Sequence, residues 1–308
     1  MKSVLVIGST CVDVIINLKR LPKTGEDLHP ESQSLAMGGC AYNVANILRQ
    51  AGASFTFATP VGSGIYGDYV AAHLAAAGIS TPIPRQQEEN GCCYCLVEES
   101  GERTFLSCHG PEYSFHKEWM KGLDLHRYSM VYICGLEVEA PTGGELVEFL
   151  EENRQLEIYF APGPRGVHIP DGRLERVLAL SPVLHINRQE AAELSGREGL
   201  REAVEALHAI TGNTVIVTLG DEGAFCMEKD GAAYRIPGVP AQVVDTIGAG
   251  DSHIGQILAS LSSHTTLKEA IRSANAVASR VVAGKGASLS DDEYLALKKT
   301  FSLPPNEA

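Results

Sequence analysis

The spacing of hydrophobic residues divides the chain into two kinds of region. Residues 3–7 form an unbroken apolar run and residues 12–18 alternate between apolar and polar, so both predict β-strands. Residues 98–102 are polar and contain a glycine, which predicts a hairpin connection between two of the strands that follow. The other strand-like runs of this part are residues 55–61, 91–97 and 103–107. The early part of the chain is therefore predicted to be rich in β-structure.

From about residue 129 the pattern becomes a strand followed by a helix, repeated. The strand-like runs are residues 130–134, 157–160, 183–186 and 215–219, and helical segments cover residues 141–152 and 173–180 and begin at 189–194. Such alternation predicts a parallel sheet with helices on both faces. Residues 249–283 carry Ala, Leu and Ile at helical spacing. Because no Pro/Gly/Ser linker interrupts this order, we expect one α/β domain over residues 1–308, with a small β appendage at about 12–36 and 91–109.

Composition narrows the classes of partner. With 44% hydrophobic and 20% charged residues, the 308-residue chain has a normal globular composition. The 25 Lys and Arg against 38 Asp and Glu leave a net charge of −13, which disfavours nucleic acid and anionic membranes as partners. The first apolar run is interrupted by Asp13 and has no cleavage site after it, so we interpret it as a buried strand rather than an export signal. Eight cysteines in a chain of this length do not make a disulfide scaffold, and without an export signal we expect reduced thiols and a cytoplasmic protein.

Residues 243–252 combine an apolar run, a glycine-rich turn and the start of a helix. Gly248 and Gly250 allow successive N–H groups to point the same way, at the positive end of the helix. Such a turn can hold the charge of a transferring phosphoryl group, and Asp251 at its edge could accept a proton from an attacking hydroxyl. The alternative is an ordinary glycine turn capped by Asp251. The spacing fits neither a Walker P-loop nor the dinucleotide fingerprint, which disfavours a dehydrogenase.

Two stretches resemble the signatures of the ribokinase-like (PfkB) carbohydrate kinases. They are the C-terminal signature at residues 245–251 and the N-terminal signature at residues 38–45, in the family's order and at its separation. The resemblance covers essentially the whole chain and is greatest to uncharacterised bacterial sugar kinases, through residues 101–105, 187–190 and 251–253. It implies a mainly parallel central sheet flanked by helices on both faces, and a small β-sheet lid. It also implies ATP- and Mg²⁺-dependent phosphorylation of a sugar or related polyol, in a homodimer paired through the lid.

The resemblance assigns roles on the acceptor side. It implies Asp251 as the general base, with the backbone of Gly248, Ala249 and Gly250 as the anion hole. The acceptor would be bound by Asp13, Gly38, Gly39, Asn43 and Glu137, and Arg165 could steady a phosphoryl group or an acidic substrate. A strand-end carboxylate for Asp13, a helix cap for Asn43 and an exposed structural arginine for Arg165 are the alternatives. Arg165 ends a stretch, residues 161–165, in which the Asp and Asn of many relatives are missing.

On the nucleotide side, the resemblance implies that Asn187 and Glu190 organise Mg²⁺ and the phosphates, largely through water. A helix cap at Asn187 completed by Glu190 is the alternative, and the two roles are compatible. Thr218, Gly220, Gly223 and, on the last long helix, Asn275 would border the nucleotide. A monovalent cation, with K⁺ as the candidate activator, would be held by Asp245 and the carbonyls of Ile247, Gly286 and Ser290.

Several features stay open at this point. His253 is expected to pack or to meet solvent beside the nucleotide, and His109 is a candidate for acceptor choice. Cys92, Cys93 and Cys95 resemble a zinc motif, but Cys92 should point away from the other two and no second pair has finger spacing. A nucleoside kinase of the same fold and a non-catalytic sugar sensor are the rival functions. An intact Asp251 turn argues against the sensor, since a sensor needs no base.

Overall fold

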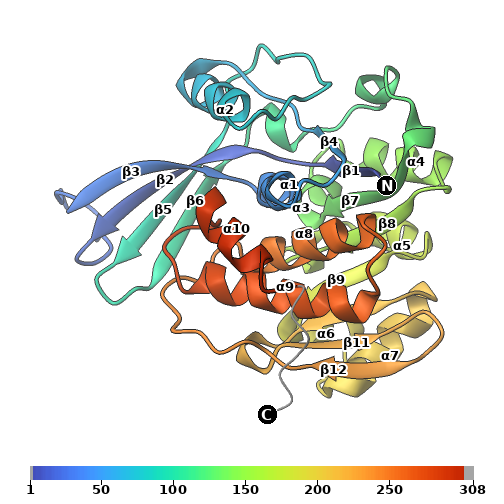
Figure 1. Ribbon diagram of the computed structural model, residues 1–308. Helices are drawn as coiled ribbons and strands as arrows, with labels where there is room; N and C mark the ends of the chain where they lie inside the picture. The colour runs from blue at the N-terminus through green and yellow to red at the C-terminus, as the bar shows by residue number, and fades with distance from the viewer. Residues whose placement is uncertain (1–2, 302–308) are drawn as a thin grey trace.

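The computed structural model describes residues 3–301 and contains two β-sheets (Figure 1). The larger sheet has eight strands in the order β12-β11-β10-β9-β8-β7-β1-β4. The six strands from β4 to β10 run parallel, β11 pairs antiparallel with β10, and β12 pairs antiparallel with β11. Their bounds are β1 Ser3–Ile7, β4 Phe55–Ala58, β7 Tyr128–Cys134, β8 Glu157–Ala161, β9 Val183–Asn187, β10 Val215–Thr218, β11 Ala224–Met227 and β12 Ala233–Ile236. The predicted parallel sheet is confirmed.

The central strands are mainly apolar because both of their faces are covered. In β1, Val4 and Val6 join one hydrophobic cluster, whereas Leu5 and Ile7 join another on the opposite face. All four side chains are buried. A strand buried on both faces loses the polar alternation of a half-exposed strand, which is why the first run has no polar residue after Ser3.

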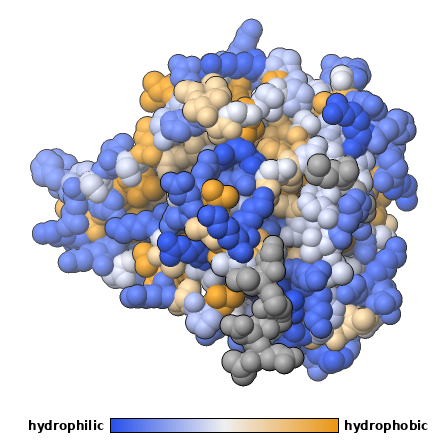
Figure 2. All heavy atoms as spheres, viewed as in Figure 1, coloured by the Kyte–Doolittle hydropathy of each residue, from blue (hydrophilic) through white to orange (hydrophobic). Residues whose placement is uncertain are grey.

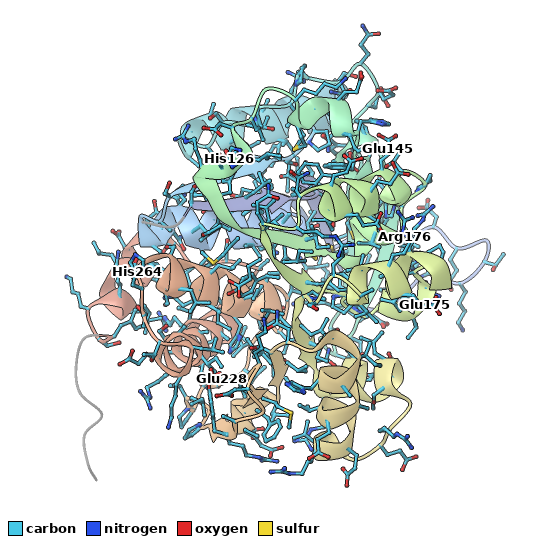
Figure 3. All side chains as sticks on the ribbon, turned by 90° about the vertical axis from the view of Figure 1, so that its right-hand side faces the viewer. His126, Glu145, Glu175, Arg176, Glu228 and His264 are labelled. Carbon is cyan, nitrogen blue, oxygen red and sulfur yellow. The ribbon has the colours of Figure 1, made fainter. Side chains whose placement is uncertain are left out.

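Helices form the two outer layers (Figure 1). One layer contains α1 Cys40–Ala51, α8 Ala249–Ser262, α9 Leu267–Val282 and α10 Asp291–Lys298. The other contains α3 Gly135–Glu139, α4 Gly143–Glu152, α5 Asp171–Leu178, α6 Arg188–Ser195 and α7 Leu200–Thr211, and α2 Gly64–Ala76 lies near the second sheet. Figure 3 shows charged residues such as Glu145 and Arg176 on the outer surface of α4 and α5. Helices on both faces are thus as predicted, and α1 is the layer-forming helix that starts within the N-terminal signature.

The second sheet projects from the body beside α1 and α2 (Figure 1). Its order is β3-β2-β5-β6, with β2 Cys11–Leu18, β3 Ser32–Gly38, β5 Cys92–Glu98 and β6 Arg103–Cys108. β5 and β6 form the predicted hairpin, whereas β2 and β5 pair in parallel, so the sheet is mixed. β5 and β6 lie within the predicted segment 91–109, whereas β2 begins one residue before the predicted segment 12–36 and β3 ends two residues after it. A mainly parallel sheet between helices, with a small second sheet as a lid, is the architecture that the family resemblance implies.

The lid carries apolar side chains on its surface. Leu35 on β3 and Phe105 and Leu106 on β6 are each 43–55% exposed. Figure 2 shows hydrophobic residues among hydrophilic ones on this projecting part. No helix within residues 3–301 is both long and apolar enough to cross a membrane.

Candidate active site

The glycine-rich turn leads directly into α8, whose N-cap is Gly248. Gly248 has a φ of 72°, and a Cβ there would collide with the carbonyl oxygen of Ala287, so only glycine fits. The backbone N–H groups of Gly248, Gly250 and Asp251 have no hydrogen-bond acceptor among residues 3–301. A Cβ on Gly250 would meet open space. The first turn of α8 therefore presents unpaired donors to an accessible volume, which is the arrangement that binds anions.

Asp251 is the third residue of α8 and not its N-cap, so the capping interpretation of this residue is wrong. Its Oδ2 accepts a hydrogen bond from Nδ2 of Asn43, on α1, at 2.9 Å. Burial raises the pKa of Asp251 to about 6, against the lowering effect of hydrogen bonds from Asn43 and Cys40. The carboxylate is therefore ionised at neutral pH and still basic enough to accept a proton.

A cavity of about 540 Å³ lies between the lid and the body, and Asp251 is part of its wall. Of the predicted acceptor residues, Asp13, Gly39, Asn43 and Arg165 also line it. Asp13 is the third residue of β2, inside the strand and not at its end, and its carboxylate has no hydrogen-bond partner among the described residues. Burial raises the pKa of Asp13 to about 6. An unpartnered carboxylate in a cavity of this size suits a small hydroxylated ligand.

Gly38 and Glu137 lie behind the wall of this cavity. A Cβ on Gly38 would collide with the carboxylate of Asp13, so this glycine makes room for the aspartate. Glu137 is 1% exposed, and its Oε1 accepts a hydrogen bond from the backbone N–H of Ser9 at 2.8 Å. Burial raises the pKa of Glu137. The structure thus places both residues as supports of the cavity wall, and the predicted contact of Glu137 with an acceptor has no geometric support.

Arg165 reaches the cavity edge but is already paired. Its guanidinium makes two hydrogen bonds to the carboxylate of Glu139, one of them from Nε at 2.7 Å. The side chain is 50% exposed. His109 stacks on Tyr113 with ring centroids 3.9 Å apart, and Tyr113 rather than His109 lines the cavity. Because Arg165 is paired with Glu139, this edge of the cavity has no unpaired Arg165 guanidinium to bind a phosphoryl group or an acidic acceptor.

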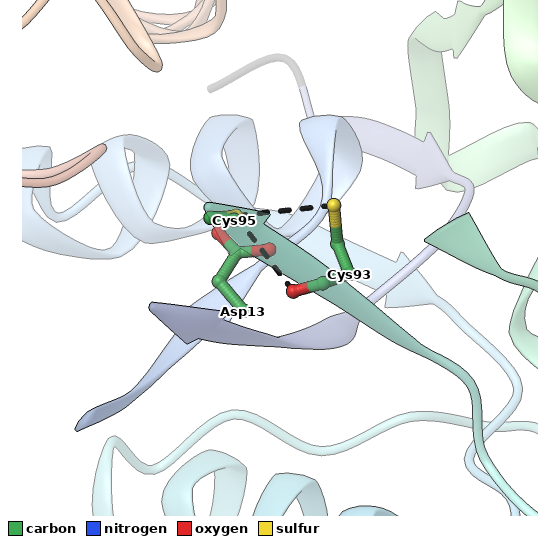
Figure 4. Close-up of side chains that lie close together, drawn as sticks. All are labelled: Asp13, Cys93 and Cys95. Carbon is green, nitrogen blue, oxygen red and sulfur yellow. Dashed lines mark hydrogen bonds between the residues drawn. The ribbon is translucent and has the colours of Figure 1, made fainter. Parts of the chain in front are cut away.

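Two cysteines of the lid share the cavity with Asp13 (Figure 4). The Sγ atoms of Cys93 and Cys95 are 3.9 Å apart, and one oxygen of Asp13 lies within 4.8 Å of both. Cys92 points into the hydrophobic core, as the strand period predicts. A hydrogen bond from Cys95 lowers the pKa of the Cys93 thiol. The sequence pattern did not indicate that Cys93 and Cys95 face the same cavity as Asp13.

A second cavity, of about 210 Å³, lies on the other side of the turn. Four predicted nucleotide residues, Thr218, Gly220, Gly223 and Asn275, all line it, together with Ala249 of the turn. Thr218, Thr246 and Gly250 line both cavities, so the two meet at the start of α8. The apolar part of the wall was not predicted and consists of Val239, Val243, Ala278 and Val282.

His253 lies under this second cavity in a buried hydrogen-bonded chain. Its Nε2 is 3.0 Å from Oδ1 of Asn275, and its Nδ1 is 2.8 Å from Nε2 of His185. The Asn275 amide group donates to the carbonyls of Ile236 and Pro237, which fixes Oδ1 toward His253. Burial lowers the pKa of both histidines, that of His253 to about 4, so the pair is neutral. The packing interpretation of His253 is confirmed, and contact with solvent is not, because the side chain is 2% exposed.

Asn187 and Glu190 form a complete capping box at the start of α6. Asn187 Oδ1 accepts the N–H of Glu190 at 2.8 Å, and Glu190 Oε2 accepts the N–H of Asn187 at 3.0 Å. Both residues also line the larger cavity. Burial raises the pKa of Glu190. A fixed carboxylate in the cavity wall fits Mg²⁺ held through its water ligands, since the carboxylate oxygens have lone pairs beyond those used in the box.

Asp245 already has a cation beside it. Its Oδ1 accepts hydrogen bonds from the N–H of Ile247 at 2.9 Å and from the guanidinium of Arg103, on β6, at 2.6 Å. Its Oδ2 accepts the N–H of Gly286 at 2.9 Å. The carbonyl of Ser290 accepts the N–H of Tyr294 in the first turn of α10. While Arg103 is bonded to Asp245, the ligand set expected for K⁺ does not fit a metal ion, because the guanidinium occupies the carboxylate.

Comparison with known proteins gives one family. The pfkB family carbohydrate kinase model matches residues 1–293. The chain is 38% identical to "Uncharacterized sugar kinase YegV" of Escherichia coli over 92% of this chain and 90% of that protein. It is 28% identical to a ribokinase of Haemophilus influenzae, over 93% and 94%. Arabidopsis thaliana ribokinase, solved with ribose and ATP, superposes with a TM-score of 0.81 at 20% identity, covering 98% and 99%.

Proposed function

The chain belongs to the pfkB family of carbohydrate kinases, and from that premise we propose that it transfers the γ-phosphoryl group of ATP to a hydroxyl of a sugar or related small polyol. Asp251 is the general base, and the backbone N–H groups of Gly248 and Gly250 form the anion hole, whereas the N–H of Ala249 donates to the carbonyl of Thr246 at 3.4 Å. The observation that carries the proposal is the meeting of two cavities at the start of α8. An acceptor in one and a nucleotide in the other would approach each other across that turn.

The acceptor hydroxyl lies against Asp251 in this proposal. Asp251 accepts its proton as the oxygen attacks the phosphorus in line, and Asn43 holds the carboxylate in place from behind. The unpaired N–H groups at the start of α8 stabilise the negative charge on the transferring group. Asp13 orients the acceptor by receiving hydrogen bonds from its other hydroxyls. Glu190 would hold Mg²⁺ through the water ligands of the ion, and the ion would neutralise charge on the phosphates.

The lid closes the acceptor cavity in this reaction and excludes water from it. We also propose that the lids of two copies pair, as the exposed side chains of Leu35, Phe105 and Leu106 support. Light scattering on the purified protein should give the mass of a dimer. Replacing Leu106 by a charged residue should give the mass of a monomer.

A screen of acceptors for ADP release tests the proposed reaction. Sugars, sugar acids, polyols and nucleosides are each offered with ATP and Mg²⁺. Release with a sugar or polyol is expected, and Asp251→Asn should lower turnover about 10²–10⁴-fold while nucleotide binding stays nearly intact. Asp68→Asn, an exposed carboxylate on α2 outside both cavities, is the control and should change nothing.

Three outcomes contradict the proposal. Near-normal turnover of Asp251→Asn would remove the base assignment. Phosphorylation of nucleosides alone would make the protein a nucleoside kinase of the same fold. Tight binding of a sugar with no ADP release under any condition would make it a sensor.

A further inference from the structure

We propose that Arg103 is the resident cation of the Asp245 site, so that the lid itself supplies the positive charge that a monovalent ion would otherwise bring. The reaction then needs no K⁺. The catalytic part of this inference rests on the proposed function, whereas the ion-binding part does not.

Both carboxylate oxygens of Asp245 already accept hydrogen bonds from the protein. Its side chain is 5% exposed, and all three donors around it come from the protein, namely Ile247, Gly286 and Arg103. Burial alone would raise the pKa of Asp245, but the hydrogen bonds from Arg103 and the two backbone N–H groups outweigh it and lower the pKa. The carboxylate is thus charged, buried and already neutralised.

A potassium ion and a guanidinium cannot share this carboxylate favourably. An ion needs oxygen ligands, and arginine offers only donors. An ion placed against Asp245 would also meet the charge of Arg103, which lies 2.6 Å from Oδ1 and is 23% exposed. Repulsion between like charges is weakly screened at a site with so little water. The arginine must leave before an ion can bind.

Arg103 differs from a dissolved ion because it is attached to the lid. It is the first residue of β6, and Phe105 and Ser107, two and four residues later on the same face of the strand, line the acceptor cavity. Asp245 bonds the N–H of Ile247, which directly precedes the first glycine of the anion hole. The ion pair therefore joins the lid strand over the acceptor to the turn that holds the phosphoryl group. Arg103 acts here as a positioning residue.

Turnover in two salts tests the inference. At equal ionic strength, wild-type protein should turn over equally in KCl and in tetramethylammonium chloride, whose cation is too large for the site. The turnover of Arg103→Gln in tetramethylammonium chloride should fall about tenfold or more, because the variant leaves the buried carboxylate of Asp245 without its cationic partner. KCl should restore part of this loss. Arg103→Lys keeps a cation and should stay indifferent to the salt. Arg20→Gln, another lid arginine paired with a glutamate, is the control and should behave as wild type.

Thermal unfolding in the same salts gives a readout that does not depend on turnover. K⁺ should leave the midpoint of wild-type unfolding unchanged and should raise that of Arg103→Gln, because the ion then binds only the folded variant. Stimulation or thermal stabilisation of the wild type by K⁺, but not by tetramethylammonium, would overturn the inference. A loss in Arg103→Gln that K⁺ restores in neither measurement would also overturn it. If no acceptor is ever phosphorylated, the unfolding data still decide the ion-binding part.

Discussion

Replacing Asn43 by alanine removes an amide group that bonds Asp251, the proposed base. Asn43 Nδ2 donates to Asp251 Oδ2 at 2.9 Å, and both residues line the acceptor cavity. A donor stabilises the ionised form of a carboxylate, so its loss must raise the pKa of Asp251. Because a base works only when deprotonated, the acidic limb of the pH–rate profile should move to higher pH.

The size of the shift follows from the energy of the bond. A hydrogen bond to a charged group contributes about 1.5–3 kcal/mol, and one pKa unit corresponds to about 1.4 kcal/mol. Water entering the open cavity replaces part of the bond, which leaves a shift of about one unit. The limb should therefore move from about pH 6 in the wild type to roughly pH 7 in the variant. At pH 6 the ionised fraction would fall from about one half to about one tenth, roughly a fivefold loss.

The assay is kcat/KM for the acceptor between pH 5 and pH 9 at saturating ATP. This ratio reports the ionisation of the enzyme before the acceptor binds, and the pKa of Asp251 in the wild type is about 6. Loss of an acceptor contact would lower the whole curve, whereas loss of the bond to Asp251 moves the limb. Asn46→Ala is the matched control, because Asn46 is buried on the same helix and bonds Arg49 instead. A limb that stays in place, or moves to lower pH, in Asn43→Ala would refute the reasoning.

Three further predictions concern the same cavity and its wall. Burial raises the pKa of Asp251 in the folded state from 3.8 to about 6, so the charged carboxylate costs stability that grows between these two pH values and is complete above about pH 6. The free energy of unfolding in urea should therefore be up to about 3 kcal/mol larger for Asp251→Asn than for the wild type at pH 8, and almost unchanged below pH 4. Micromolar Zn²⁺ should inhibit competitively with the acceptor, because Cys93, Cys95 and Asp13 offer three close ligand atoms, and a Cys93→Ser, Cys95→Ser double variant should resist it. Glu137→Ala should lose about 1–3 kcal/mol by leaving a buried N–H unpaired, whereas Glu137→Gln, which keeps the acceptor oxygen, should lose less in the same unfolding assay.

The parallel strands could be predicted closely because their sequence pattern has a single physical cause. Strand β1 occupies the predicted residues 3–7, and β9 extends the predicted 183–186 by one residue. Burial on both faces leaves continuous apolar runs, which a local window detects. Strands β11 and β12 were not predicted. Each has four residues, and β12 is exposed at two of them, so its pairing with β11 and not its own pattern makes it a strand.

In the candidate site, too, residues with a local sequence match could be predicted, whereas pairs that depend on the folded topology could not. Thr218, Gly220 and Asn275, which the family resemblance assigned to the nucleotide, line one cavity. That assignment came from matching single positions outside the two signatures. The partners of these signatures could not be found in this way. Arg103 and Asp245 are 142 residues apart, and His185 and His253 are 68 apart, so only the folded topology brings each pair together.

Two carboxylates six residues apart in one signature have opposite environments. Asp245 is bonded by three donors, which lower its pKa, whereas Asp251 has a single amide donor and a thiol against a burial cost that raises its pKa. A carboxylate that accepts several hydrogen bonds has a low pKa and is a poor proton acceptor, whereas a carboxylate whose pKa is raised by burial is a better one. The sequence presents both as acidic ends of a glycine-rich turn. Their environments assign the structural role to Asp245 and leave Asp251 as the carboxylate able to act as a base.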